Sequence, residues 1–257
     1  VKTKVENQFK MTPNEFEQAL TKKTKAVIIN SPSNPTGMGY TESELRNITD
    51  IACKHNILIV TDEMYEQIIF DDFKHASIAT FGSKAYELTF TFNAVSKTHA
   101  MTGWRIGFVA GNKDIIKAMD NLQSQSTSNP CSISQKAALE ALTGSQTHIP
   151  IMVSAFKKRR DLILKMIQEN PQIKCPKPIG AFYIFPDVST YFGKKHGETV
   201  IQNSLDLTNY LLEQAHVAVV PGEAFGEDNC IRISYATSDE LIIKGMERIL
   251  NCLNKLN

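Results

Sequence analysis

LTFTFNAVSKTHAMTGWRIG, at residues 88–107, joins a short apolar run to a loop rich in small residues. The apolar run, 88–92, is typical of a β-strand. The loop carries Lys97 eight positions before Arg105. A lysine amine can condense with an aldehyde, and a guanidinium can hold a phosphate through two parallel hydrogen bonds. The stretch therefore predicts a strand followed by a loop suited to a phosphorylated aldehyde.

Three other apolar runs in the first half of the chain predict further strands, at 26–29, 57–60 and 106–110. The runs 26–29 and 57–60 are apolar throughout, which is expected of strands buried on both faces. Between them, Thr41-Glu42-Ser43-Glu44 reads as a capping box and predicts a helix that ends near His55. Strands separated by helices indicate a mostly parallel α/β sheet flanked by helices.

The second half of the chain has a different pattern, with longer helices and shorter strands. Gln135 stands at a capping-box position of the first of these helices. We expect one large domain at 1–150 and a smaller α+β domain at 151–257. The predicted helices lie at 132–142, 149–170, 205–215 and 239–253, and the predicted strands at 181–185, 217–220 and 231–234.

The composition excludes several classes of function. The formal net charge is +1, so the chain has no basic excess for nucleic-acid binding. No apolar run reaches the roughly 18 residues of a membrane helix. The five cysteines are scattered and the six histidines lack metal-ligand spacing, which favours reduced thiols in the cytoplasm and no metal site. The chain begins at Val1 instead of Met, which leads us to expect a piece of a longer protein.

Polar side chains follow the predicted strands at their carboxyl ends, where open α/β sheets bind ligands. Asp62 comes after the run 57–60 and could hold a pyridinium nitrogen protonated, whereas the alternative is a helix N-cap. Tyr65 could donate a hydrogen bond to a phenolate oxygen of the same ring, or could simply pack. Asn34, in the turn-rich SPSNPTG at 31–37, could donate to that oxygen too, and a plain turn is its alternative. The Asn34–Pro35 bond is predicted to be cis.

Arg232 alternates with isoleucines in CIRISYA at 230–236. Its guanidinium could bind a substrate α-carboxylate through two parallel hydrogen bonds. The alternative is a solvent-facing charge on an edge strand. The presence of a carboxylate, two ring-oxygen donors, an amine and a phosphate ligand at successive strand ends of one predicted sheet favours the functional interpretation.

These residues and three motifs resemble the class I/II (fold type I) pyridoxal-phosphate aminotransferases, in particular the bacterial aspartate aminotransferases of the prephenate-competent subgroup. The motifs are MTGWRIG (101–107), PGEAFG (221–226) and IRISYAT (231–237), and the likeness runs from about Lys25 to about Leu250. The resemblance implies that Lys97 forms a Schiff base with pyridoxal 5'-phosphate and then moves the substrate proton.

The resemblance also implies roles for the other polar residues. Asp62 would pair with the pyridine nitrogen, and Tyr65 and Asn34 would bind the ring oxygen. Arg105 would bind the phosphate, with Ser96 as a further phosphate ligand. Arg232, assisted by Asn34, would bind the substrate. Some relatives have a hydroxyl residue three positions before the lysine, where this chain has Ala94.

The implied reaction is transamination, with aspartate and 2-oxoglutarate giving oxaloacetate and glutamate, in a cytoplasmic homodimer. An N-terminal region that family members carry has no counterpart in this sequence, so we expect this piece alone to be inactive. Aromatic, prephenate or other amino-acid aminotransferases remain alternatives, as does a pyridoxal-phosphate-dependent carbon–sulfur lyase. A transaminase-like sensor domain of a transcription regulator is a further alternative.

Overall fold

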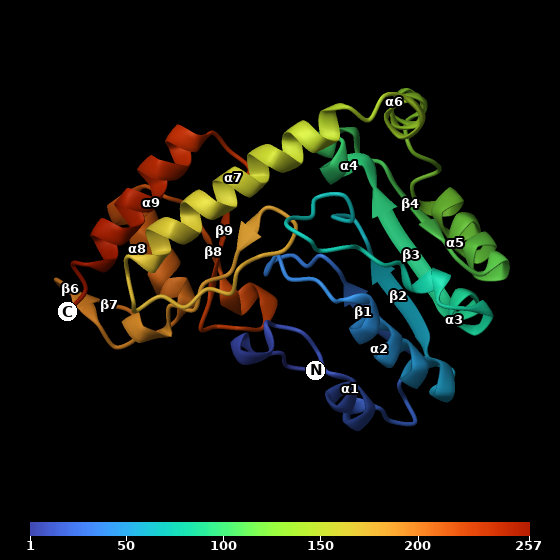
Figure 1. The fold of residues 1–257 in the computed structure, drawn as a ribbon, viewed down its shortest axis with the longest axis horizontal. Coiled ribbons are helices and arrows are strands. Elements are labelled where there is room, and N and C mark those ends of the chain that lie inside the picture. Colours follow the sequence, from blue (N-terminus) through green and yellow to red (C-terminus); the bar gives the residue numbers. More distant parts are fainter. The chain divides into compact units, whose positions relative to one another are not determined.

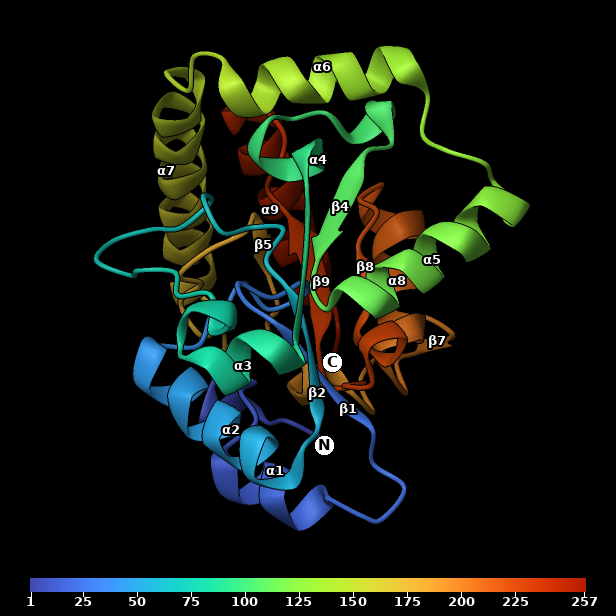
Figure 2. The same cartoon turned by 90° about the vertical axis from the view of Figure 1, so that its right-hand side faces the viewer.

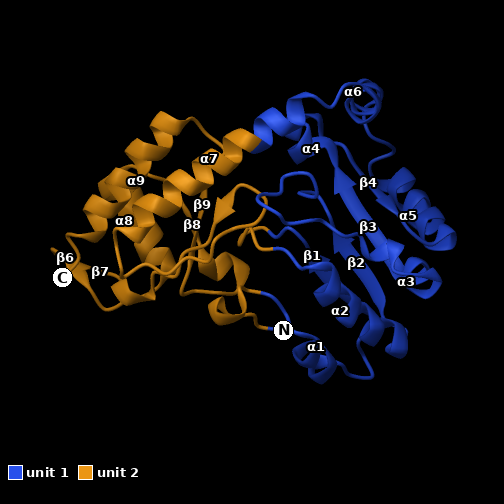
Figure 3. Ribbon diagram, in the orientation of Figure 1, with its two compact units in different colours: residues 1, 10–33, 39–153 blue, residues 2–9, 34–38, 154–257 orange.

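A computed structural model describes all residues from 1 to 257 and divides them into two compact units (Figure 3). Unit 1 comprises residue 1, 10–33 and 39–153, and unit 2 comprises 2–9, 34–38 and 154–257. The domain boundary near residue 150 stays a prediction. The units add a feature that the sequence pattern does not indicate, because the short segments 2–9 and 34–38 pack with the C-terminal part of the chain.

Unit 1 is built on a four-stranded sheet in the order β1-β2-β3-β4 (Figure 1). Strands β1, β2 and β3 are parallel, which confirms the mostly parallel α/β sheet, and β4 runs antiparallel to β3. Asn30, Asp62 and Phe92 lie at the same level across the three parallel strands. The strands span Ala26–Asn30, Leu58–Asp62, Thr89–Ala94 and Gly107–Ala110.

Helices α1 and α2 cover one face of this sheet, as Figure 2 shows. Phe16 of α1 and Ile48 of α2 pack in one core cluster with Ile59 of β2. The predicted capping box is present, because the Thr41 side chain accepts from the backbone N–H of Glu44 and the Glu44 side chain accepts from that of Thr41. The helices on this side span Pro13–Ala19 (α1), Glu42–His55 (α2) and Ser83–Leu88 (α3).

The prediction that β1 is buried on both faces is wrong. Its residues alternate between buried and exposed, and Ile28 is 74% exposed while Ile29 is 3% exposed. The reason is that α1 and α2 pack against only the face that carries Val27 and Ile29.

The part of unit 1 that follows β3 contains β4 and several helices. It contains α4 (Val95–Thr98), α5 (Lys113–Ser126), α6 (Ser132–Thr143) and the start of α7 (His148–Gln168). The capping box predicted around Gln135 is absent, because α6 has Cys131 as its N-cap and that residue makes no side-chain cap bond. The Gln135 amide donates instead to the Pro130 carbonyl.

Unit 2 is an α+β unit around a small antiparallel sheet in the order β5-β9-β8. The predicted strand 231–234 matches β9 (Ile231–Ser234), but β5 (Tyr183–Ile184) and β8 (Val220–Pro221) are shorter than the predicted 181–185 and 217–220. Helices α8 (Ser204–Ala215) and α9 (Asp239–Leu253) contact each other, and β6 and β7 form a separate ribbon at Lys195–His196 and Thr199–Val200.

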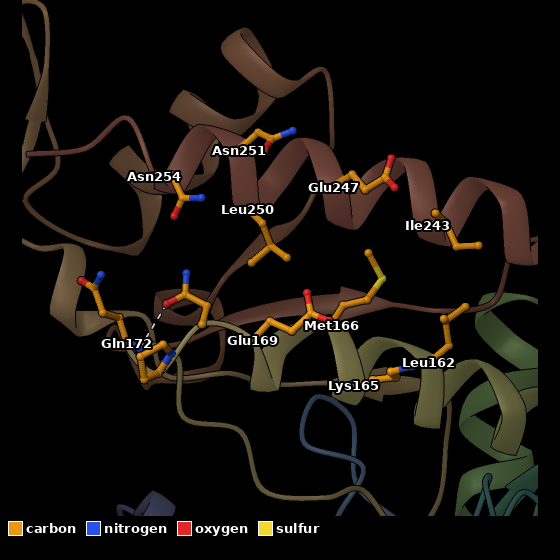
Figure 4. Close-up of a pocket in the computed structure, with 12 residues that line it drawn as sticks. Leu162, Lys165, Met166, Glu169, Gln172, Ile243, Glu247, Leu250, Asn251 and Asn254 are labelled. Carbon is orange, nitrogen blue, oxygen red and sulfur yellow. Dashed lines mark hydrogen bonds between the residues drawn. The ribbon is translucent and has the colours of Figure 1, made fainter.

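A wide groove in unit 2 lies between the second half of α7 and α9 (Figure 4). Its volume is ≈ 810 Å³, and Leu162 and Met166 from α7 and Leu250 from α9 are among the residues that line it. None of the residues predicted to bind cofactor or substrate lines it. The largest of the hollows described here is therefore separate from the predicted chemistry. None of the helices combines the length and apolar character needed to cross a membrane.

Candidate active site

Asp62 is the last residue of β2 and lines a largely apolar pocket of ≈ 420 Å³ in unit 1. Val60, Phe92 and Val109 from three neighbouring strands lie around the same pocket. One carboxylate oxygen of Asp62 accepts a hydrogen bond of 3.1 Å from the backbone N–H of Met64. The carboxylate therefore lies at a strand end, held by the backbone in a mainly apolar setting.

Burial raises the pKa of the Asp62 carboxyl, and the nearby negative charge of Glu63 raises it further. The Met64 N–H and the positive charge of Lys97 act in the opposite direction and lower that pKa. A carboxylate in this state is stabilised by any cation brought close to it. Its environment suits a protonated ring nitrogen as partner.

Lys97 lies on the short helix α4, directly after β3. Val95 of this helix is fully buried and clusters with Ile106 and Ala138. This anchoring fixes the start of α4 beside the strand ends, and the charge of Lys97 is close enough to act on Asp62. Unit 1 thus brings Lys97 and Asp62 into one electrostatic neighbourhood.

Tyr65 lies in the turn after β2 and is 3% exposed. The residue two positions before it, Glu63, is also buried and accepts three side-chain hydrogen bonds. These come from the hydroxyls of Thr61 (3.2 Å) and Ser77 (2.9 Å), and the third joins Glu63 to Nε2 of His75 at 3.1 Å. We call Glu63 with these three residues the Glu63 network. It fixes the backbone between Asp62 and Tyr65.

The Glu63 network is not visible in the sequence. His75 and Ser77 stand 12 and 14 positions after Glu63, and no helix or strand period connects them. The only local signal is a second acidic residue directly after Asp62. Glu63, Glu66 and His75 each place one potential metal-ligand atom within 4.8 Å of the others, a grouping that histidine spacing did not predict. Glu63 and His75 already hydrogen-bond each other there.

Arg105 follows a short 3-10 helix, Thr102–Trp104, and has a left-handed backbone with φ of 55°. Its guanidinium is exposed and donates to the carbonyl of Thr102 at 2.9 Å. Ser96 is 9% exposed. The neighbouring Thr98 hydroxyl is buried without a hydrogen-bond partner, which sequence reasoning missed.

Asn34 and Arg232 meet in unit 2, although they stand 198 positions apart in the sequence. Nη1 of Arg232 donates to the side-chain oxygen of Asn34 at 2.9 Å. The guanidinium carbon lies 4.8 Å from the ring centre of Tyr183 and 5.1 Å from that of Phe225. The rings and the amide hold the guanidinium in one orientation.

Nε of Arg232 is buried and has no hydrogen-bond partner. Strand β9, which carries it, is the central strand of its sheet, so the edge-strand alternative is wrong. A guanidinium that uses Nη1 within the protein and leaves a buried N–H unsatisfied is suited to donate to a carboxylate.

The segment 34–38 is seated in unit 2 by its backbone. The Asn34–Pro35 bond is cis, which confirms the prediction, and Ser31–Pro32 is cis as well. The carbonyl of Gly37 accepts hydrogen bonds from the N–H groups of Ile179 (2.9 Å) and Gly180 (3.0 Å). The position of Asn34 beside Arg232 therefore depends on a loop far along the chain.

Comparison with known proteins places these residues in context. Residues 1–249 match the family model described as aminotransferase class I and II. A probable aspartate/prephenate aminotransferase of Rickettsia prowazekii is 50% identical over 254 residues, which cover 98% of this chain and 64% of the relative. The aspartate aminotransferase of Bacillus subtilis is 45% identical over 251 residues, which cover 97% of this chain and 63% of the relative. The chain thus spans a little under two thirds of these relatives' length.

Solved structures agree with the sequence comparison. The crystal structure of an aspartate aminotransferase from Rhizobium meliloti superposes with a TM-score of 0.95 at 39% identity, covering 100% of this chain and 65% of that one. An aromatic aminotransferase from Pyrococcus horikoshii gives a TM-score of 0.91 at 38% identity, covering 98% of this chain and 66% of that one. These similarities confirm the α/β fold class expected from the strand and helix pattern.

Proposed function

The chain belongs to the class I and II aminotransferase family, and from this premise we propose that the whole protein is a pyridoxal-phosphate-dependent aminotransferase. The proposed reaction converts aspartate and 2-oxoglutarate to oxaloacetate and glutamate. Relatives named aspartate/prephenate and aspartate aminotransferase support this substrate pair. The amino group moves from one acid to the other, so no external oxidant or reductant is needed.

The polar residues of unit 1 fit this cofactor by their chemistry. When bound, pyridoxal phosphate supplies an electron sink for the substrate carbon that loses its proton. Lys97 would hold the cofactor and carry that proton on its amine, and Asp62 would hold the proton on the ring nitrogen. Tyr65 would donate to the ring oxygen, and the exposed guanidinium of Arg105 would bind the phosphate.

Unit 2 supplies the residues for the substrate. The observation that carries the proposal is the buried, unpaired Nε of Arg232 beside an Nη1 that is fixed on Asn34. Such a donor matches the α-carboxylate that every amino acid and 2-oxo acid substrate shares. Because the Asn34 oxygen accepts from Arg232, the amide nitrogen is the atom that would donate to the cofactor's ring oxygen.

The proposal is tested by locating the covalent attachment of the cofactor in the whole enzyme. After borohydride reduction, mass spectrometry should find pyridoxal phosphate on Lys97. The Lys97→Ala variant should lose this label and about 10⁴-fold in kcat, because a residue that moves the proton contributes up to that factor. Lys113→Ala, which alters an exposed lysine at the start of α5, is the matched control. Labelling of a different lysine would reject the assignment.

Prephenate or aromatic substrates are the second candidate, because several relatives are named for prephenate and one similar structure is an aromatic aminotransferase. Values of kcat/KM, measured with the same enzyme for aspartate and phenylalanine as amino donors and for 2-oxoglutarate and prephenate as amino acceptors, decide between them. Larger values for aspartate and 2-oxoglutarate support the first proposal, and a larger value for phenylalanine or prephenate supports the second.

We also propose that the whole enzyme is a cytoplasmic homodimer. The five cysteines are all free thiols, which suits a reducing compartment. Helix α5 exposes Ile115, Met119 and Leu122 along one stripe, which offers an apolar surface for a second copy. Sedimentation of the wild type and of Leu122→Lys tests this, since the substitution should weaken the dimer.

A further inference from the structure

Arg160, on the part of α7 that belongs to unit 2, is among the largest fully buried side chains of the protein. Its Nε and Nη2 contact the carboxylate of Asp161 at 2.9 and 2.7 Å. Its Nη1 donates to the carbonyl of Pro178 at 2.9 Å. Burying a guanidinium costs free energy unless its N–H groups are hydrogen-bonded. The groups that accept from Arg160 therefore indicate its role.

Pro178 is the first residue of the loop 178–180, which holds Gly37 in place. The next two N–H groups, of Ile179 and Gly180, donate to the Gly37 carbonyl. The fit is close, because a Cβ on Gly37 would lie 2.6 Å from Cβ of Pro178 and 2.9 Å from the carbonyl oxygen of Gly180. Arg160 therefore fixes one side of a seat that accepts only glycine.

Gly37 in turn determines where Asn34 lies. Pro35 and Thr36, between them, are buried, and the Thr36 hydroxyl accepts from the N–H of Met38 at 3.2 Å. The segment is thus held at both ends, by the Gly37 carbonyl in its seat and by the Asn34 oxygen on Arg232. A shift of the seat would move the Asn34 amide.

We propose that Arg160 is a positioning residue for the cofactor site, acting through Pro178, the loop 178–180 and Gly37 on the Asn34 amide. The inference rests on the proposed function, in which Asn34 donates to the ring oxygen. Arg160 itself touches neither cofactor nor substrate in this scheme. Its effect would be to hold the Asn34 amide in place, so that the amide could donate to the ring oxygen of bound pyridoxal phosphate and favour the deprotonated form of that oxygen.

The first test uses the unloaded chain and hydrogen exchange of the Ile179 and Gly180 amides. Arg160→Met should accelerate their exchange about tenfold or more, as expected for the loss of one hydrogen bond from a charged donor. Arg160→Lys keeps a charged donor and should give a smaller acceleration. Arg159→Met is the matched control, because Arg159 is adjacent on the same helix and pairs with Asp239 at 3.0 Å instead.

Exchange of core amides in β1 separates the proposal from a general loss of stability. If Arg160→Met accelerates Val27 and Ile29 as much as Ile179 and Gly180, the residue is only structural and the proposal is overturned. Faster exchange confined to the loop 178–180 supports it. Equal rates in Arg160→Met and wild type at Ile179 and Gly180 also overturn it.

The second test uses the loaded whole enzyme and the pH midpoint at which the absorbance of bound cofactor changes. Asn34→Ala should raise this pH midpoint, and Arg160→Met should raise it by a smaller amount. In the double variant, Arg160→Met should add nothing to Asn34→Ala, because both act through one amide.

The outcomes of this second test are distinct. Additive shifts in the double variant, or an unchanged midpoint in Arg160→Met, would overturn the link from Arg160 to Asn34. An unchanged midpoint in Asn34→Ala, with the cofactor still attached to Lys97, would overturn the role of Asn34 and the inference with it. Absence of the cofactor from Lys97 would instead reject the proposed function.

Discussion

The two units hold their predicted functional residues in different ways. In unit 1, Asp62 and Lys97 stand at or just after the ends of neighbouring parallel strands, and the sheet register together with the packing of α4 holds them there. In unit 2, Arg232 stands in the centre of an antiparallel sheet and is completed by Asn34, which arrives from a distant part of the sequence.

This difference teaches that the functional residues of the two units depend on different physical interactions. The unit 1 residues depend on strand pairing and on helix packing against one face of the sheet. The unit 2 pair depends on one short segment seated through a backbone carbonyl and a glycine without room for a side chain. Substitutions should therefore affect the units in different ways.

The largest expected effect is on substrate binding in unit 2. Arg232→Lys removes the planar fork that holds a carboxylate through two hydrogen bonds, so kcat/KM for aspartate should fall about a hundredfold. Steady-state kinetics of the whole enzyme measure this. Arg248→Lys, on the exposed surface of α9, is the control and should leave kcat/KM unchanged. A wild-type value for Arg232→Lys would remove Arg232 from the site.

The next effect concerns the seat of the segment 34–38. Gly37 has φ of +67° and no space for a Cβ, so Gly37→Ala should lower the free energy of unfolding by about 2–4 kcal/mol. Urea denaturation measures the change. Gly193→Ala is the matched control, since Gly193 also has a positive φ but has no atom within 4 Å of its Cβ position. It should cost only about 1 kcal/mol. Equal losses in the two variants would show that the seat is not tightly packed.

A smaller effect is expected from the Glu63 network in unit 1. Ser77→Ala removes the hydroxyl that donates to the buried Glu63 carboxylate at 2.9 Å, which should lower the free energy of unfolding by about 1.5–2 kcal/mol. Thermal unfolding at neutral pH gives the value. Ser43→Ala, at an exposed position of α2, provides the comparison. If Ser77→Ala has no larger effect than Ser43→Ala, the network does not stabilise the strand end.

The smallest change in stability should come from Asp62→Asn, and it should be a gain. The pKa of Asp62 is higher in the folded state than in the unfolded state. The favourable contribution of this carboxyl to the free energy of unfolding is therefore complete below the unfolded-state pKa and is lost as pH rises through the folded-state pKa. At pH 7 the unloaded Asn variant should therefore be more stable, by less than about 1 kcal/mol after solvent screening. The difference should disappear near pH 3. A loss of stability at pH 7 would contradict the assigned burial.

The sequence allowed much of unit 1 to be predicted because its signals are local. The apolar runs at 26–29 and 57–60, with the capping box at Thr41 between them, correspond to β1, β2 and α2. The antiparallel direction of β4 was missed because the connection from β3 contains only short helical turns instead of a crossover helix. The exposed face of β1 was missed because a continuous apolar run does not reveal which face has a partner.

The contacts that complete the site lie beyond such local signals. The bonds of Glu63 to His75 and Ser77 and the Arg160 contact with Pro178 join positions 12 to 18 residues apart with no shared period. The pairing of Asn34 with Arg232 spans 198 positions and follows from how the segment 34–38 packs. The sequence of that segment does not indicate where it packs. Asn34 and Arg232 were each selected for their chemistry, but their contact was not predicted.

The interleaved course of the chain also constrains the order of events during protein synthesis. At about 5–20 residues per second, roughly 10–40 s separate the emergence of Asn34 from that of Arg232 on a ribosome. The strands on both sides of the segment 34–38 can pair during that interval, because β1 and β2 are complete by residue 62. The segment then lies in a loop between two paired strands before the residues 178–180 that hold Gly37 have been made. The segment 34–38 is therefore made well before the residues that seat it within unit 2.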